Sequence, residues 1–134
     1  MSDKYIISDM HLQHERCATE WRGFSSLEEH DATILANHNL IVKPKDKVYH
    51  LGDVCFKAHN MNILGQLNGS KLLTLGNHEK QNLTKYLEYF DRICASHIFD
   101  DMIFTHIPIH PILMDTRYKG LVNVHGHIHK DKDQ

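Results

Sequence analysis

The stretch VYHLGD, residues 48–53, decides the fold, because a short apolar run ends there in a glycine and a carboxylate. Four more apolar runs in the chain end in a similar way, in side chains that bind metal ions. The five polar ends are Asp9 to His11, Gly52 with Asp53, residues 76–79 (GNHE), His106, and residues 126–129 (GHIH). Strands interleaved with helices predict an α/β fold, in which the loops just beyond strand ends carry the function.

The polar and apolar spacing predicts the secondary structure around these ends. We expect strands at 4–8, 48–51, 71–75, 93–99, 102–105 and 121–125. We expect short helices at 60–68 and 81–90. A longer helix begins at a capping box, either Ser25 with Glu28 or Ser26 with Glu29, and ends before Pro44. Segments 10–24 and 107–120 are expected to be loops, and 130–134 a solvated tail.

Composition sets the class of protein. A chain of 134 residues with 41% hydrophobic residues predicts one domain, residues 1–134. A formal net charge of −2 gives no basic signal for nucleic acid or a membrane surface. Three widely spaced cysteines form no disulfide framework, and the N-terminus has no long apolar run. We therefore expect a cytoplasmic protein without a signal peptide or membrane span. Thirteen histidines are unusually many, and although some will be surface residues, the number prompts a search for metal ligands.

Two pairs of candidate ligands are spaced two residues apart. Asp9 and His11 follow the first strand, and His127 and His129 follow the last. In an extended chain, residues at this spacing face the same side. Carboxylate with imidazole favours Mn²⁺, Fe²⁺ or Zn²⁺ over Ca²⁺. Taken alone, each pair is also compatible with an ordinary surface loop.

The central segments supply the remaining candidates. A carboxylate such as Asp53 can bridge two cations with its two oxygens, and Asn77 is a neutral oxygen ligand beside an acid–base group, His78. A single histidine after a strand, such as His106, is usually structural. Together these side chains suffice for two sites that share Asp53. Two cations roughly 3.5–4 Å apart polarise a phosphoryl oxygen and generate a hydroxide at neutral pH.

The order D-x-H, G-D, G-N-H-E, H, G-H-x-H resembles that of the calcineurin-like metallophosphoesterase superfamily. The motifs extend from Asp9 to His129, nearly the whole chain. Residues 8–15, 49–54 and 124–129 resemble the small, single-domain bacterial and phage branch, whose substrates are poorly defined. The resemblance implies a β-sandwich of two sheets flanked by helices, in a minimal form without a cap domain.

The resemblance also implies roles for individual residues. The first metal would bind Asp9, His11, Asp53 and His129, and the second Asp53, Asn77, His106 and His127. His78 would lie near the leaving group as an acid or charge stabiliser, with Glu79 holding it. The implied ions are two divalent metals, Mn²⁺ foremost, with iron, zinc or nickel as alternatives. A hydroxide that bridges the metals would attack phosphorus in line.

Two departures from the family pattern narrow the activity. Phe56 stands where many members have a second aspartate, and Leu75 stands where Ser/Thr protein phosphatases have an arginine. A protein phosphatase is therefore disfavoured. We expect a phosphodiesterase that acts on a small nucleotide or a nucleic-acid end. The alternatives are a phosphomonoesterase or nucleotide pyrophosphohydrolase on the same site, and a metal-binding module without catalysis.

Further side chains near the motifs are candidates for substrate contact. Five could bind phosphate: His14, Lys57, His59, His110 and Arg117. Three could stack on a base: Trp21, Phe24 and Tyr118. Exposure to solvent or ordinary packing is the alternative role for each of them. Loops 12–26 and 107–120 are expected to form the wall of the substrate pocket.

Overall fold

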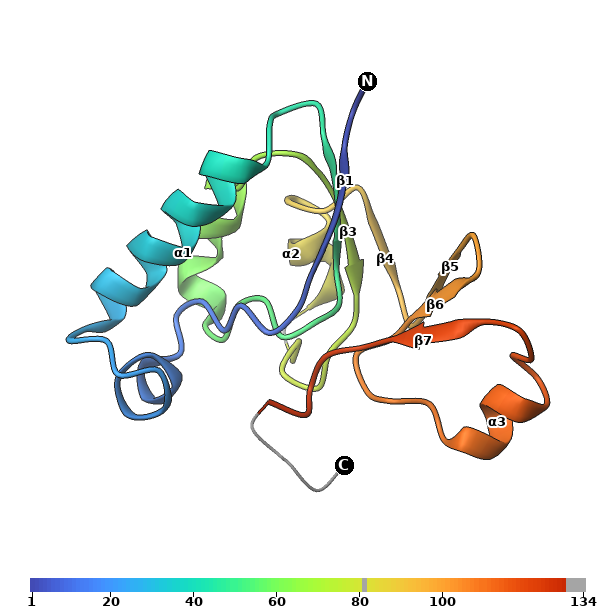
Figure 1. Ribbon diagram of the computed structural model, residues 1–134. Coiled ribbons are helices and arrows are strands. Elements are labelled where there is room, and N and C mark those ends of the chain that lie inside the picture. Colours follow the sequence, from blue (N-terminus) through green and yellow to red (C-terminus); the bar gives the residue numbers. More distant parts are fainter. Residues whose placement is uncertain (81, 130–134) are drawn as a thin grey trace.

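The computed structural model describes residues 1–80 and 82–129 and has two sheets with helices around them (Figure 1). The first sheet is parallel, in the order β1 (Lys4–Ile7), β2 (Lys47–His50), β3 (Ser70–Thr74) and β4 (Arg92–Cys94). The second sheet is mixed, in the order β5 (His97–Phe99), β6 (Met102–Phe104) and β7 (Val122–Val124). β5 is antiparallel to β6, and β7 is parallel to it. The expected α/β architecture with two sheets is confirmed.

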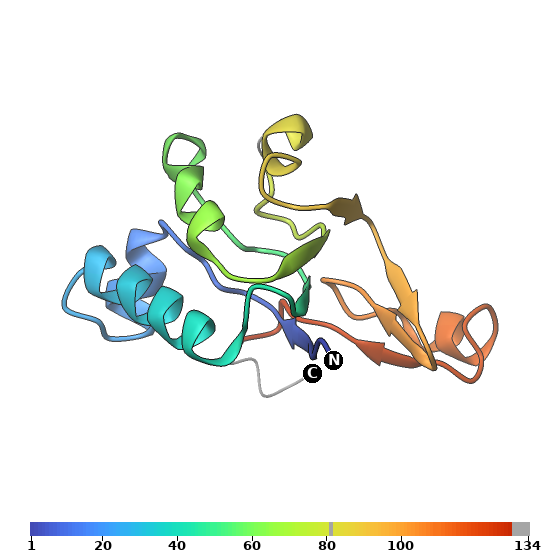
Figure 2. The ribbon, with the colours of Figure 1, turned by 90° about the horizontal axis from the view of Figure 1, so that it is seen from above.

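Helical segments lie on one side of the first sheet and the second sheet lies on the other (Figure 2). They are η1, a π-helical turn (Cys17–Trp21), α1 (Leu27–Ile41), η2, a 3₁₀ segment (Ala58–Gln66), and α2 (Leu83–Tyr86). A further helix, α3 (Pro111–Asp115), precedes β7. None of the helices in the described ranges is both long and apolar enough to cross a membrane.

Each face of the first sheet has its own apolar core. On the helical side, the buried cluster includes Leu12, Leu64, Leu73 and Phe90. On the other side, Tyr49, Leu51 and Phe104 pack between the two sheets. Because both faces of β2 are covered, Val48, Tyr49 and His50 are all buried, as expected for a parallel strand between two layers. This packing fixes the strand ends from which the polar segments emerge.

The longest helix, α1, begins at the predicted capping box. The Ser26 side chain accepts a hydrogen bond from the Glu29 backbone N–H at 3.1 Å. The Glu29 carboxylate in turn accepts from the backbone N–H and the hydroxyl of Ser25. The second of the two expected pairings is therefore the one that forms. Such a cap satisfies donors at the helix start that would otherwise lack partners.

Four sequence-based predictions of secondary structure are wrong. The strand expected at 93–99 is two strands, β4 and β5, which belong to different sheets. The helix expected at 81–90 is one turn, which Asn82 caps by accepting from the Thr84 N–H, while residue 81 lies outside the described residues. The two expected loops contain η1 and α3. Pro111 suggested a loop, yet proline fits the first turn of a helix.

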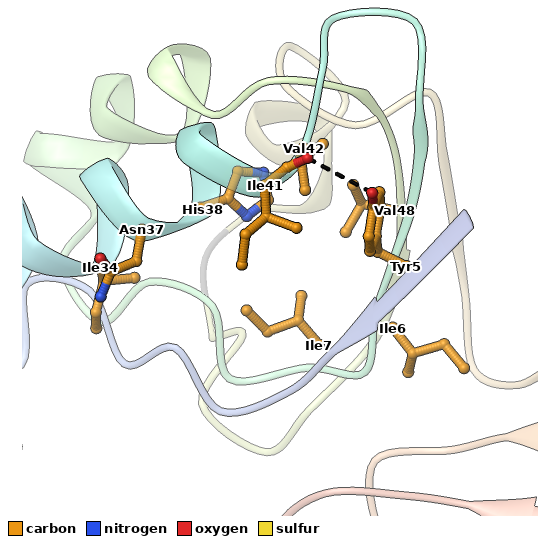
Figure 3. A pocket seen from close by; sticks show the side chains of 9 residues that line it. All are labelled: Tyr5, Ile6, Ile7, Ile34, Asn37, His38, Ile41, Val42 and Val48. Carbon is orange, nitrogen blue, oxygen red and sulfur yellow. Dashed lines mark hydrogen bonds between the residues drawn. The ribbon is translucent and has the colours of Figure 1, made fainter. Parts of the chain in front are cut away.

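A hollow of about 320 Å³ lies between α1 and β1, the edge strand of the first sheet (Figure 3). Its wall is mostly apolar and includes Ile7, Ile34 and Val42. The Tyr5 hydroxyl closes one end by donating to the Ile41 carbonyl at 3.5 Å. No predicted metal ligand or substrate contact lines it.

One core residue makes stability depend on pH. His50 is 0% exposed, and within the described part of the chain neither ring nitrogen has a hydrogen-bond partner. It stacks on His38 at 6.1 Å and meets Phe90 edge-on at 5.3 Å. Burial lowers the pKa of His50 to about 3. An unfolded histidine has a pKa of about 6.5, so the stability that this group contributes is full above that value and is lost as pH falls toward 3.

We expect the metal-free protein to lose about 2 kcal/mol of unfolding free energy through His50 alone between pH 7 and pH 5. The variant His50→Leu should show a correspondingly flatter dependence in urea titrations at the two pH values. Replacing an exposed histidine, His59→Leu, is the matched control and should keep the wild-type slope. Equal slopes for His50→Leu and wild type would contradict the argument.

Candidate metal centre

Three glycines let the strand-end loops meet. Gly52 has a φ of +94°, and a Cβ there would lie 2.6 Å from the backbone nitrogen of Gly76. A Cβ on Gly76 would lie 2.6 Å from the backbone nitrogen of Asp53. A Cβ on Gly126 would overlap the Ser8 hydroxyl and the Asp9 carboxylate. The loops therefore approach one another as closely as backbone allows, which brings their polar side chains together.

Five predicted ligands have a left-handed backbone. Their φ values are 55° at Asp9, 50° at His11, 52° at Asp53, 73° at His127 and 53° at His129. The extended chain expected for the two spaced pairs is therefore wrong. A positive φ is uncommon outside glycine and persists only where surrounding structure enforces it. Here the contacts of the merged loops hold these conformations and aim the side chains inward.

The first cluster consists of Asp9, His11 and His129. His11 Nε2 lies 3.2 Å from His129 Nε2 and 3.7 Å from Asp9 Oδ1. His129 Nε2 lies 3.4 Å from the same carboxylate oxygen. Asp9 Oδ1 is buried and makes no hydrogen bond to any described residue. A buried carboxylate oxygen that faces two imidazole nitrogens is the arrangement a cation would complete.

The second cluster consists of Asp53, His106 and His127. His106 Nε2 lies 3.2 Å from Asp53 Oδ2 and 3.2 Å from His127 Nδ1. The predicted neutral ligand, Asn77, joins this cluster, with its Oδ1 at 2.9 Å from His106 Nε2. The seven predicted ligands thus lie in two neighbouring groups.

One oxygen of Asp53 connects the clusters. Asp53 Oδ2 lies 3.7 Å from His11 Nε2 and 3.2 Å from His106 Nε2. The other oxygen, Oδ1, accepts a hydrogen bond from the backbone N–H of His78 at 2.9 Å. The sequence alone suggests a bridge that uses both oxygens of Asp53. The geometry instead directs Oδ2 to both clusters and uses Oδ1 to orient the carboxylate.

Neighbouring groups orient the ligands. The Ser8 hydroxyl and the His127 N–H donate to Asp9 Oδ2 at 2.6 and 3.0 Å, which leaves Oδ1 facing the first cluster. His106 donates its Nδ1–H to the Leu51 carbonyl at 2.7 Å, so its Nε2 lone pair faces the second cluster. Such outer hydrogen bonds fix the tautomer of a metal-binding histidine.

The electrostatic environment favours two ionised carboxylates. Burial alone would raise the pKa of Asp9, but the His11 ring, the Ser8 hydroxyl and the His127 N–H lower it below its usual range. Burial likewise opposes ionisation of Asp53, yet contacts with His106 and His78 lower its pKa. Burial lowers the pKa of His129, which favours its neutral, metal-binding form.

The predicted catalytic pair, His78 and Glu79, lies beside the second cluster. His78 Nε2 is 4.0 Å from Asp53 Oδ2, and 30% of its side chain is exposed. The Glu79 carboxylate does not hold the His78 ring as expected. It accepts from the backbone N–H groups of Asp53, Val54 and Gly76 at 2.9, 2.8 and 2.5 Å. Glu79 therefore ties the Asp53 loop to the Gly76 loop and is a positioning residue.

The predicted phosphate contacts occupy different surroundings. His14 is only 9% exposed, and its Nδ1 lies 3.2 Å from His11 Nδ1, behind the first cluster. Lys57 is half-buried at the start of η2, and His59 is exposed. His110 caps α3 by accepting from the Ile112 N–H, and the Arg117 guanidinium lies 5.9 Å from the Tyr118 ring. The last two contacts stay within the α3 segment and do not reach the clusters.

Sequence reasoning missed two contributors to the site. Cys17 is buried and forms a third group of potential ligands with His11 and His14. Phe56, noted only as a departure from a family pattern, stacks on His14 at 4.2 Å and lies 5.5 Å from His78. The replacement of the family's second aspartate by Phe56 is the sequence signal that could have indicated its contacts with His14 and His78.

Comparisons with other proteins match part of the chain to two curated relatives. No protein-family model matches it. It is 37% identical over 81 residues to the uncharacterized protein MJ1445 of Methanocaldococcus jannaschii, with 57% of this chain and 46% of that protein covered. It is 32% identical over 84 residues to the Gene 66 protein of Mycobacterium phage L5, with 59% and 41% covered. The aligned region thus spans less than half the length of either relative.

A solved structure shares the whole fold. The crystal structure of AQ665 from Aquifex aeolicus, a protein of unknown function, matches with a TM-score of 0.79 and 25% sequence identity. The match covers 99% of this chain and 82% of that one. The two-sheet architecture described above therefore occurs in at least one other protein.

Proposed function

We propose that the chain is a metal-dependent phosphoric ester hydrolase, a minimal calcineurin-like metallophosphoesterase that favours phosphodiesters. The observation that carries the proposal is the shared position of Asp53 Oδ2 between two clusters of ligands. Seven side chains from five segments of the sequence converge there, in the grouping that a two-metal hydrolase requires. The order of the motifs along the chain supports the same class.

The ligand types fit two divalent ions. The first cluster with Asp53 would hold one ion, and the second cluster with Asn77 would hold the other. Carboxylate, amide and imidazole donors suit Mn²⁺ foremost, with iron, zinc or nickel as alternatives. Bound divalent ions supply Lewis-acid polarisation of a phosphoryl oxygen and lower the pKa of water. The unpartnered, buried oxygen of Asp9 supports this assignment.

The chain's own residues would orient and protonate the substrate. His78 is near the clusters and accessible, so its ring can reach an ester oxygen that departs from phosphorus. A positioned histidine there stabilises or protonates the leaving alkoxide. Glu79 keeps the Asp53 and Gly76 loops joined, and so fixes the distance between His78 and Asp53.

The arginines near the clusters are engaged with other groups, and this favours a diester substrate over a monoester. A monoester dianion needs more positive partners than a diester, which carries one charge. The two arginines nearest in sequence to the first cluster are already engaged. Arg22 donates to the carbonyls of Asp9 and Met10 at 2.6 and 2.9 Å. Arg16 pairs with Glu20 at 2.8 Å. The scissile bond would accordingly be a phosphodiester bond in a small nucleotide, such as a cyclic nucleotide, or at a nucleic-acid end.

With Mn²⁺ present, we expect faster hydrolysis of bis-p-nitrophenyl phosphate than of p-nitrophenyl phosphate, and loss of both activities in EDTA. A colorimetric panel that also contains cyclic nucleotides, dinucleoside polyphosphates and short oligonucleotides measures this directly. A clear preference for the monoester would favour the phosphomonoesterase, and alanine variants of Lys57 and Arg117 would then test for a phosphate clamp. No metal-dependent turnover of any panel member would indicate a binding module.

A further inference from the structure

A cavity of about 560 Å³ adjoins the first cluster. Its wall is formed by Cys17, Glu20, Trp21, Arg22 and His129. Because His129 belongs to the first cluster, the cavity borders the candidate metal centre. Its volume falls within the range of roughly 300–1,000 Å³ that is usual for small-molecule sites. Apart from His129, none of these side chains is among the seven predicted ligands, although Cys17 also belongs to the group of potential ligands with His11 and His14.

Two of the side chains in the cavity wall, Trp21 and His129, carry aromatic rings. The Trp21 ring lies 6.4 Å from the His129 ring and 5.3 Å from the His14 ring, both at steep angles. Trp21 ends the η1 turn, and the next residue, Arg22, anchors that turn to the Asp9 and Met10 carbonyls. The indole is 44% exposed, so it remains accessible from the cavity.

The cavity presents little free positive charge. The Arg22 guanidinium donates to two carbonyls and also lies 2.8 Å from His30 Nε2. Burial raises the pKa of the Cys17 thiol, which keeps it neutral. The remaining charge is the Glu20 carboxylate, which is 61% exposed and paired with Arg16. Among the described residues, a further cation near this wall is Arg16, whose guanidinium lies 5.9 Å from the Trp21 ring and pairs with Glu20. This wall therefore suits a flat uncharged ring with N–H donors better than an anionic group.

We propose that this cavity binds the nucleobase of a substrate whose phosphate ester lies at the metal centre. The base would stack on Trp21, and Glu20 at the rim would accept from its N–H groups. Stacking on an aromatic side chain is tolerant of base identity, since every base has a π face. The inference rests on the proposed function for the location of the phosphate, but the base site itself does not depend on catalysis.

Trp21 is the only tryptophan, so its fluorescence reports this cavity alone. We expect adenosine to quench that fluorescence saturably in metal-free protein, and ribose, the same molecule without its base, to leave it unchanged. AMP with Mn²⁺ should bind more tightly than adenosine. Equal responses to adenosine and ribose would overturn the inference. Quenching by adenosine without tighter binding of AMP would keep the base site and contradict the proposed function.

Variants test the stacking directly. Saturation-transfer NMR should show adenosine binding weakened on the order of 10-fold or more in Trp21→Ala, and largely retained in Trp21→Phe. Tyr89→Ala, which removes an aromatic ring outside the cavity, is the matched control and should bind adenosine as the wild type does. Unchanged binding in Trp21→Ala would overturn the inference even if the protein hydrolyses bis-p-nitrophenyl phosphate.

Discussion

Asp53→Asn is expected to remove most of the bound metal from both clusters. Asp53 Oδ2 is the oxygen within 3.7 Å of a ligand nitrogen in each cluster. In the variant, the His78 N–H would keep the amide oxygen at the Oδ1 position. The amide nitrogen, a donor, would then face both cations. The loss of affinity should exceed the roughly 10–100-fold that removal of an outer hydrogen-bond partner costs.

Elemental analysis of the purified variant, after dialysis against Mn²⁺, measures this result. Asp115→Asn is the matched control, because that carboxylate is exposed at the end of α3. It should retain the metal content of the wild type. Wild-type content of both ions in Asp53→Asn would contradict the assignment of a shared ligand.

His78→Ala should keep its metal and lose turnover by roughly 10²–10⁴-fold, as is typical of a positioned acid–base group. The contact that orients Asp53 comes from the His78 backbone, so an alanine preserves it. The imidazole itself is surplus to the seven ligands. Metal content and kcat, measured on the same preparation, separate the two roles.

The neighbouring exposed residue offers a control for this experiment. Lys80→Arg alters the same loop but keeps the positive charge that acts on the His78 ring, and the backbone hydrogen bond of residue 80 to the His78 carbonyl survives. It should retain wild-type turnover. Loss of metal in His78→Ala with unchanged turnover per bound ion would show that His78 is a ligand instead.

The sequence predicted the α/β class because its signals are local. The capping box of α1 and the apolar runs that became β1, β2 and β3 depend on neighbouring residues only. The split between β4 and β5 could not be found in this way. Residues 93–99 contain no glycine or proline that would mark a break, and the change of sheet depends on which strands lie beside each half.

The candidate site shows the same division. The spacing of acidic and histidine side chains after strands sufficed to pair Asp9 with His11, whereas the grouping of Asp53 with Asn77 came only from the family resemblance. The spacing could not reveal that only Oδ2 of Asp53 faces both clusters. That orientation depends on a hydrogen bond to Oδ1 from the backbone N–H of His78, in the loop that follows β3. Nor could it show that Glu79 joins two loops. Its partners are the backbone N–H groups of Gly76, three residues away, and of Val54 and Asp53, which are 25 and 26 residues away.

The left-handed residues carry a consequence for engineering. At Asp9, His11, Asp53, His127 and His129, the backbone has a conformation that glycine adopts without steric cost. Glycine at any of these positions would relieve local strain and delete a ligand in the same step. Stability of the fold therefore favours glycine at these five positions, whereas metal binding requires the carboxylate and imidazole side chains. A directed-evolution screen that rewards heat tolerance alone would favour chains that have lost the centre.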